Sequence, residues 1–292
     1  MSETLDKRLH PVRPDLAARS YQGRVDAARF VDGTKKRVTR SIAPIRPEPR
    51  TDRSIDTQAL FGETFTVYEE TAEGWAWGQL ETDGYVGFMP SDALVADSPA
   101  PTHRVAALRS YRYPYAELKS PPLDLLSMGS LVAVAGYETT RGLDYALLAD
   151  GSAIVAKHLV PLDHRVGDWV SVAESFAGTP YLWGGRSSLG LDCSAILQLA
   201  AQAGGVKIMR DSYMQEETAG EALDISAGLP DLKRGDLVFW KGHIGIMRDA
   251  ETLLHANGFT MMVSSEPLAG AIARIREKDG TPVTAVRRIR HS

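Results

Sequence analysis

The sequence predicts an α+β domain in the C-terminal part of the chain, preceded by two small all-β barrels and an N-terminal helical arm. Two observations lead to this architecture. Between residues 54 and 164, short apolar runs alternate with turn-forming residues, as in small antiparallel barrels. From residue 166 onward, amphipathic helical segments come first and short apolar strands follow them.

Residues 1–53 form the predicted arm. Apolar residues between Leu16 and Val31 predict one helix, and the prolines of the stretch SIAPIRPEPRTDRS predict a linker after it. Basic residues outnumber acidic ones in this arm, which we interpret as a solvated surface.

The barrels are predicted over residues 54–100 and 103–164. In the first, the runs TFTVYEE, WAWGQLE and YVGFM are separated by the turn signals AEG and TDG. The second has a similar number of predicted strands, and both end in a short helical turn, MPSDAL and VAKHL respectively. We therefore expect two consecutive barrels rather than one sandwich.

Residues 166–292 form the predicted α+β domain. The stretch GDWVSVAESFAGTP is amphipathic, and a second helix is predicted to begin at Cys193. The runs LVFW, HIGIMR, TLLHAN, MMVSS and AVRRIR then predict an antiparallel sheet. Helices that precede such a sheet are typical of the α+β class.

Net charge and hydropathy indicate which binding partners are excluded. The 292 residues carry a net charge of −4, which argues against a protein that binds nucleic acid or an anionic membrane as a whole. The opening stretch MSETLDKRLHPVRPDLAARS has no apolar run long enough for a signal peptide, and no later segment resembles a membrane span. We therefore expect a cytoplasmic protein, of an oligomeric state that the sequence does not indicate.

Cys193 is the only cysteine of the chain. A lone cysteine is commonly a small buried hydrophobe, but here a glycine-rich turn leads to it and a helical pattern follows it. Asp192 suits the N-cap of that helix, so that Cys193 lies at the positive end of the helix dipole. This placement predicts a thiolate nucleophile.

A cysteine nucleophile needs a base, usually a histidine that a third group orients. Of the seven histidines, His243 and His255 lie in the predicted sheet of the C-terminal domain. A hairpin turn centred on Ala250 would place both on one face as diagonal neighbours, which suits a base and its orienter. A turn shifted by one residue would put them on opposite faces.

The same three residues also fit a zinc site, but none of the usual close ligand spacings occurs. The glycine-rich stretch GRSSLG lacks the lysine of a phosphate-binding loop. We therefore predict no metal and no cofactor.

Four strings carry a resemblance to a known family: YLWGGRSSLGLDCSA, RDSYMQ, RGDLVFWKGHIGI and LLHANG. Together they make residues 166–292 resemble the NlpC-type cysteine peptidases, papain-like enzymes that cut bacterial cell-wall peptides. The two barrels look like bacterial SH3 domains. This arrangement is similar to that of recycling enzymes that hydrolyse the bond between γ-D-glutamate and an L-diamino acid, lysine or diaminopimelate, in released murein peptides.

The resemblance implies a role for each matching residue. Cys193 would be the nucleophile, His243 the base and His255 the group that holds its ring. A free L-alanine amine of the substrate would be bound by two carboxylates, Asp192 beside the cysteine and Glu63 of the first SH3-like domain, and the other matching positions would line the pocket. The implied substrate-binding residues are Glu63, Tyr85, Trp183, Asp192, Ser194, Asp211 and Ser212.

Other interpretations stay open at this point. Asp192 fits a helix cap alone, Glu63 a solvated strand end, and Trp183 the core. The whole chain also fits a catalytically weak SH3-type protein that binds wall peptides, or a papain-like amidase or acyltransferase.

Overall fold

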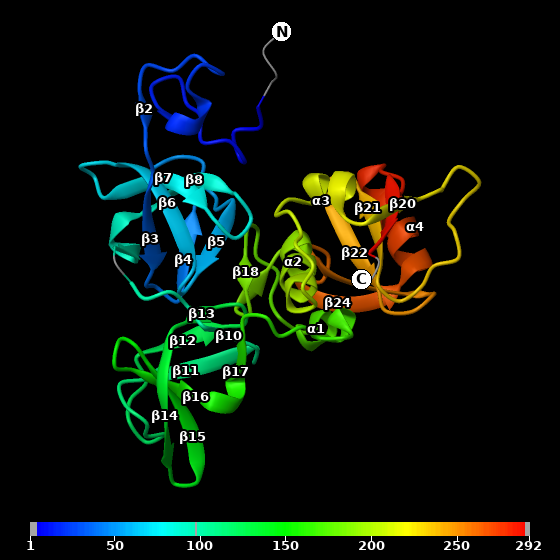
Figure 1. Cartoon of the computed structure of the whole chain (residues 1–292). Helices are drawn as coiled ribbons and strands as arrows, with labels where there is room; N and C mark the ends of the chain where they lie inside the picture. Colours follow the sequence, from blue (N-terminus) through cyan, green and yellow to red (C-terminus); the bar gives the residue numbers. More distant parts are fainter. Residues whose placement is uncertain (1–4, 97, 290–292) are drawn as a thin grey trace. The chain divides into compact units, whose positions relative to one another are not determined.

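The computed structural model describes residues 5–96 and 98–289. The chain divides into two compact units, Met1–Leu162 and Asp163–Ser292, and the colours of Figure 1 follow the sequence through both. The first unit is built from β-strands, and the second combines helices with a sheet.

The helix expected between Leu16 and Val31 is wrong. This segment forms β1 (Ala17–Ala18) and β2 (Phe30–Val31), which pair in parallel, with a 3-10 turn, η1 (Arg19–Tyr21), between them. Gly23, at φ +80°, breaks the helical path inside the segment.

The apolar residues of the arm pack against the first sheet instead of lining a helix. Leu16 is fully buried beside Trp77 and Phe88, and the Arg13 guanidinium lies 4.4 Å from the Trp77 ring centroid. Contacts with a distant sheet therefore override a weak helical pattern.

The predicted linker also carries strands. β4 (Ile42–Ile45) pairs with β5 (Thr57–Leu60), and its buried residues alternate with half-buried ones. β3 (Thr34–Val38) joins the main sheet of the first β region, which therefore begins near Thr34 rather than at residue 54. Pro44 is tolerated in β4 because that strand belongs to a two-stranded sheet.

The first β region contains the strands predicted from alternation. Its five-stranded sheet has the order β8-β7-β6-β3-β9, and β4 and β5 form a second sheet. Both contribute to one core, which includes Val38, Ile45, Phe65 and Met89. The remaining elements are β6 (Thr64–Glu70), β7 (Trp75–Leu80), β8 (Val86–Pro90), η2 (Ser91–Ala93) and β9 (Leu94–Val95).

The second β region covers residues 103–161. Its sheets have the orders β13-β10-β17 and β12-β11-β16-β15-β14, and they share a core that includes Val105, Leu126, Val132 and Ile154. The elements are β10 (His103–Val105), β11 (Arg109–Tyr113), β12 (Asp124–Ser127), β13 (Leu131–Val132), β14 (Val134–Thr140), β15 (Leu143–Leu148), β16 (Ala153–Val155), η3 (Ala156–His158) and β17 (Leu159–Pro161).

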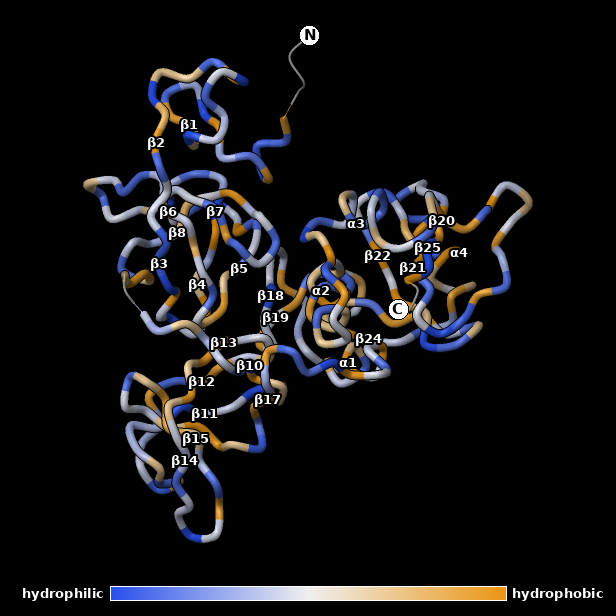
Figure 2. Tube along the Cα trace, viewed as in Figure 1, coloured by the Kyte–Doolittle hydropathy of each residue, from blue (hydrophilic) through white to orange (hydrophobic). Residues whose placement is uncertain are grey.

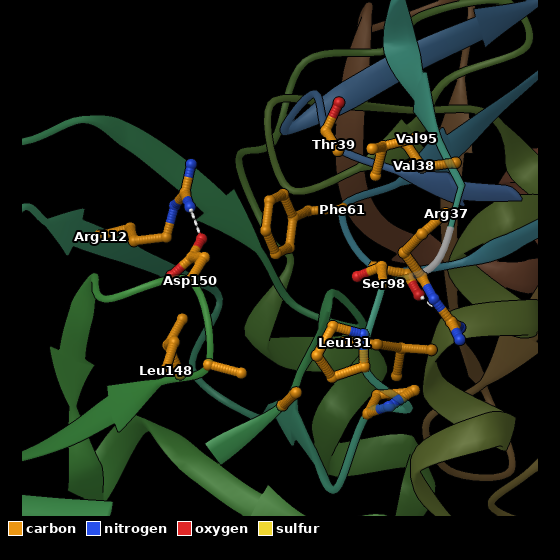
Figure 3. Close-up of a pocket in the computed structure, with 15 residues that line it drawn as sticks. Arg37, Val38, Thr39, Phe61, Val95, Ser98, Arg112, Leu131, Leu148 and Asp150 are labelled. Carbon is orange, nitrogen blue, oxygen red and sulfur yellow. Dashed lines mark hydrogen bonds and ion pairs between the residues drawn. The ribbon is translucent and has the colours of Figure 1, made fainter. Parts of the chain in front are cut away.

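The two β regions meet around Phe61, beside a cavity of about 200 Å³. Figure 3 shows Phe61 projecting toward Arg112 and Asp150, and the Arg112 guanidinium lies 4.7 Å from the Phe61 ring centroid. The Leu131 amide donates to the Phe61 carbonyl at 2.8 Å. Gly62, at φ +79°, allows this approach, because a Cβ there would lie 1.9 Å from the Leu131 carbonyl oxygen.

We expect Gly62→Ala to lower the free energy of unfolding by about 2 kcal/mol or more, because it adds a backbone clash to left-handed strain. Gly151→Ala is the control: its φ is +85° but no atom lies within 4 Å of the added Cβ, so it should cost only about 1 kcal/mol. Urea denaturation of the full chain measures both. Equal losses would contradict a close contact at Gly62.

The second unit contains a six-stranded sheet of order β20-β25-β21-β22-β23-β24. The two helices and five strands predicted for this unit are confirmed, and the described residues add two helices and three short strands that were not predicted. The helices are α1 (Trp169–Ser175), α2 (Cys193–Ala203), α3 (Ser212–Thr218) and α4 (Leu268–Asp279); the strands are β18 (Arg186–Ser187), β19 (Gly190–Leu191), β20 (Glu221–Leu223), β21 (Asp236–Trp240), β22 (His243–Met247), β23 (Thr252–Asn257), β24 (Met262–Pro267) and β25 (Ala285–Arg288).

Helix α4 was not predicted, and because it lies between β24 and β25 it corrects the expectation that all helices of this unit precede the sheet. It packs against Val238, Trp240, Met247 and Leu253 through Ile275 and other apolar residues. Residues of the opposite parity, such as Ile244, face the side where α2 contacts β22 and β23. Apolar stretches in Figure 2 mark these central strands.

None of the helices within residues 5–96 and 98–289 has the length and hydropathy needed to cross a bilayer.

Candidate active site

The nucleophile candidate opens helix α2, as predicted. Cys193 is the first residue of the helix, and the Asp192 carboxylate caps it by accepting from the Ala195 amide at 2.8 Å. The turn before it is closed by the short β18–β19 hairpin. Cys193 is only 8% exposed, so the surrounding protein shields it from water.

Asp192 also forms a buried ion pair with Arg210. Arg210 Nη1 and Nη2 donate to Asp192 Oδ1 and Oδ2 at 3.0 and 2.6 Å. Ser194 Oγ accepts from Arg210 Nη1 at 2.8 Å and donates to Asp192 Oδ1 at 3.0 Å. This network fixes the start of α2. The sequence analysis did not identify Arg210 as part of the site, although Arg210 is the first residue of the string RDSYMQ.

The free protein does not favour the thiolate, contrary to the sequence prediction. Burial raises the pKa of the Cys193 thiol to about 12, and the neighbouring Asp192 charge acts in the same direction. A hydrogen bond from the Ile244 amide and the charge of Arg210 oppose this shift only in part. Full burial shifts a pKa by up to about 3–5 units. The helix dipole contributes about 1 kcal/mol, which corresponds to less than about one pKa unit. Desolvation therefore outweighs the helix dipole here.

The two histidines meet as the parity argument predicted. β22 and β23 pair Ile246 with Leu254 and Met247 with Leu253, so the hairpin turn is centred on Ala250. His243 Nε2 and His255 Nδ1 lie 2.9 Å apart. The Ile244 amide, which directly follows His243, is the one bonded to the Cys193 thiol. Chain connectivity therefore places the backbone of the predicted base next to the nucleophile.

The Glu266 carboxylate extends the hydrogen-bonded pair formed by His243 and His255. His255 Nε2 lies 2.8 Å from Glu266 Oε1, and Arg274 pairs with the same oxygen. A carboxylate accepts, so His255 carries its proton on Nε2 and accepts from His243 Nε2–H on Nδ1. This leaves the lone pair of His243 on Nδ1.

Both rings are neutral at neutral pH. Burial lowers the pKa of His243 to about 3, with further lowering by His255 and Arg274, and lowers the pKa of His255 to about 4. Three of the four ring nitrogens already take part in hydrogen bonds, so the arrangement suits proton transfer better than zinc ligation.

The implied substrate-binding residues of the second unit lie around α2 and α3. Trp183 is 65% exposed, which excludes a place in the core. Asp211 occupies the N-cap position of α3 without a capping hydrogen bond from its side chain, and Ser212 is the first residue of that helix. Both are half-buried.

Glu63 and Tyr85 belong to the first unit. Glu63 is 2% exposed and accepts from the Leu60 amide at 2.7 Å and from Thr82 Oγ1 at 2.5 Å, so it is no solvated strand end. Tyr85 is 1% exposed and packs in the core of the first β region. Both remain proposed substrate-binding residues.

A cysteine at a helix start, beside a neutral histidine that a second histidine and a carboxylate orient, defines a cysteine peptidase of the papain-like kind. Comparison with known proteins then gives the family. Residues 178–276 match the NlpC/P60 family, and residues 45–94 match the bacterial dipeptidyl-peptidase SH3 domain.

Two curated relatives span most of the chain. The chain is 30% identical over 235 residues to the γ-D-glutamyl-L-lysine dipeptidyl-peptidase of Bacillus subtilis, a match that covers 70% of this chain and 73% of that protein. It is 24% identical over 265 residues to dipeptidyl-peptidase 6 of Lysinibacillus sphaericus, covering 84% and 96%. The fold is also similar to that of an NlpC/P60 family protein from Bacillus cereus, with a TM-score of 0.71 at 21% identity over 87% of this chain and 99% of that one.

The chain therefore belongs to the NlpC/P60 family, and it is a cysteine peptidase, a hydrolase. This confirms the resemblance and decides against a protein that only binds wall peptides. The SH3 assignment is confirmed for the first β region; for the second it stays a prediction.

We expect Glu266→Gln to lower kcat/KM by about tenfold or more, a loss of about 1.4 kcal/mol of transition-state stabilisation. Glutamine keeps an acceptor for His255 but removes the charge that supports an imidazolium and leaves Arg274 unbalanced. Steady-state kinetics across pH measures the effect, with exposed Glu277→Gln on α4 as the control. Equal activity of both variants would show that Glu266 does not assist the base.

The raised pKa of Cys193 predicts how the free enzyme reacts with iodoacetamide. Because the thiolate fraction grows as pH rises toward a pKa of about 12, alkylation should be slow near pH 7 and accelerate by about tenfold per pH unit up to about pH 9. Mass spectrometry follows the single cysteine directly. A rate that is constant between about pH 5 and pH 8 would indicate a preformed thiolate–imidazolium pair instead.

Proposed function

We propose that this peptidase hydrolyses the γ-D-glutamyl–L-diamino acid bond of small murein peptides that carry a free N-terminal L-alanine. The observation that carries the proposal is the ordered array of Cys193, His243, His255 and Glu266. It occurs in a chain similar to a relative named for γ-D-glutamyl-L-lysine dipeptidyl-peptidase activity. A role in cytoplasmic recycling of murein peptides stays a prediction of the sequence.

The array supports a two-step acyl transfer. His243 Nδ1 takes the proton of the Cys193 thiol while the sulfur attacks the γ-carbonyl carbon of glutamate. The C–N bond then breaks, His243 returns the proton to the departing amine, and a thioester remains. His243 then deprotonates a water molecule, which attacks the thioester carbonyl carbon. The C–S bond breaks, His243 returns the proton to the Cys193 sulfur, and L-Ala-γ-D-Glu is released.

The charge changes of this cycle are matched by the site. The developing oxyanion is stabilised by the Cys193 amide at the free end of α2, a donor worth roughly 3–4 kcal/mol of barrier. The imidazolium formed at His243 is stabilised through His255 by the Glu266 carboxylate. The Cys193 thiol and the His243 imidazole are therefore neutral in the free enzyme and become charged only during the reaction.

Substrate selection is assigned to carboxylates that bind the free amine. Asp192 is already balanced by Arg210, so we propose that it holds Ser194 and the α2 start in place and acts on the amine through this network. Asp211, half-buried at the start of α3, is the proposed direct partner of the ammonium in the second unit. The role that the resemblance implies for Glu63 of the first unit stays a prediction of the sequence. Trp183 and Ser212 complete the proposed pocket of the second unit, and the role implied for Tyr85 of the first unit stays a prediction of the sequence.

We expect the purified protein to release L-Ala-γ-D-Glu from L-Ala-γ-D-Glu-L-Lys or its diaminopimelate analogue, as detected by chromatography and mass spectrometry. Acetylation of the N-terminal alanine should reduce kcat/KM by about a hundredfold or more, because it removes the positive charge that the proposed carboxylate partner binds. Cys193→Ala should release nothing. Equal cleavage of free and acetylated peptides would refute the amine specificity but not the peptidase.

A further inference from the structure

A groove of about 750 Å³ lies in the second unit, at the end of the β22–β23 hairpin opposite to the histidines. Its walls come from the loop after β20, from the hairpin turn, and from the segment where β24 ends and α4 begins. In Figure 1 the loop after β20 and α4 both lie on the side of the second unit opposite to α2. The volume falls within the range of roughly 300–1,000 Å³ that is usual for ligand sites.

The groove is separate from the catalytic array. Glu251, in the β22–β23 turn, precedes His255 by four positions in the chain, and four residues of an extended strand span roughly 13 Å. Within residues 5–96 and 98–289, no residue of the catalytic array or of the proposed substrate pocket lines the groove. A ligand bound there therefore contacts a surface that the peptidase reaction does not use.

The floor of the groove is apolar and continuous with the core of the unit. Eight of the ten lining residues are apolar. Leu232 and Ile272 are half-buried and pack against the core cluster that contains Trp240 and Met247. Leu229 is 44% exposed, so its side chain presents apolar surface to solvent. Contiguous exposed apolar surface with a polar rim is typical of sites that bind other proteins.

The two charged residues of the lining are carboxylates, Asp231 and Glu251. Both are exposed, and in the part of the chain that the structure describes neither forms an ion pair. Arg234 and Arg248, the nearest arginines along the chain, instead pair with carboxylates of α1 and its N-cap. The groove therefore has negative charge at its rim, which complements a cationic ligand.

We propose that this groove docks a segment of a partner protein in which apolar side chains are flanked by lysine or arginine. The apolar floor supplies most of the affinity, and the two carboxylates select basic flanks over acidic ones. Amphipathic helices bind apolar grooves in this way, with apolar residues about every three to four positions. This docking surface does not depend on which substrate the peptidase cleaves.

The test measures the fluorescence anisotropy of labelled synthetic peptides in the presence of the full-length protein. The probe is a lysine–leucine peptide with its leucines at helical spacing. One comparison peptide has glutamate in place of every lysine, and the other has serine in place of every leucine. The wild type should bind the probe with a Kd in the micromolar range, and each comparison peptide about tenfold more weakly or worse.

Two groove variants locate the binding. Asp231→Asn/Glu251→Gln should weaken binding of the probe by about fivefold and reduce its salt dependence. Leu229→Ser should weaken binding by about tenfold because it removes apolar contact surface. The matched control Glu217→Gln/Glu277→Gln removes two exposed carboxylates of the same unit that do not line the groove, and it should bind like the wild type. Unchanged peptidase activity shows that each variant is folded.

Three results would overturn the proposal. The first is no binding of the probe at millimolar concentration, and the second is equal binding by the wild type and both groove variants. The third is a second copy of this chain in the groove: sedimentation would then show a concentration-dependent dimer that Leu229→Ser abolishes. Equal affinity for the glutamate–leucine peptide would overturn the assignment of basic flanks.

Discussion

The hydrogen bond between His243 and His255 is the contact on which the active site depends. It exists because the β22–β23 hairpin turns about Ala250, which places two residues twelve positions apart on the same face. A shift of one residue would send one ring to the opposite side of the sheet. The pairing of Ile246 with Leu254 and of Met247 with Leu253 sets this register.

Burial gives the site its electrostatic character. The thiol and both imidazoles are neutral in the free protein because each is shielded from water. Charged groups are present nearby, but in pairs: Asp192 with Arg210, and Glu266 with Arg274. The site therefore surrounds a neutral thiol and a neutral imidazole with fixed ion pairs. These charged groups need to move little when the proton passes from sulfur to nitrogen.

The two ion pairs stabilise different parts of the site. The Asp192–Arg210 pair fixes the start of α2 and thus the position of the sulfur. The Glu266–Arg274 pair lies next to His255, and Arg274 also lines a cavity of about 240 Å³ beside both histidines. The Arg274 guanidinium also lies 4.3 Å from the ring centroid of Phe259, in the loop after β23, so that α4 and this loop are connected.

Local patterns in the sequence determined the succession of strands along the chain, the start of α2 and the placement of both histidines on one face of the hairpin. Each of these features depends on neighbours within a few residues. The helix expected in the arm failed, since Leu16 buries against Trp77 rather than in a helix. Tertiary structure alone decided the partners of the catalytic groups. Arg210 reaches Asp192 and Glu266 reaches His255 only through packing of separate elements, and burial, which raises the pKa of Cys193, is a property of the folded chain that no short stretch contains.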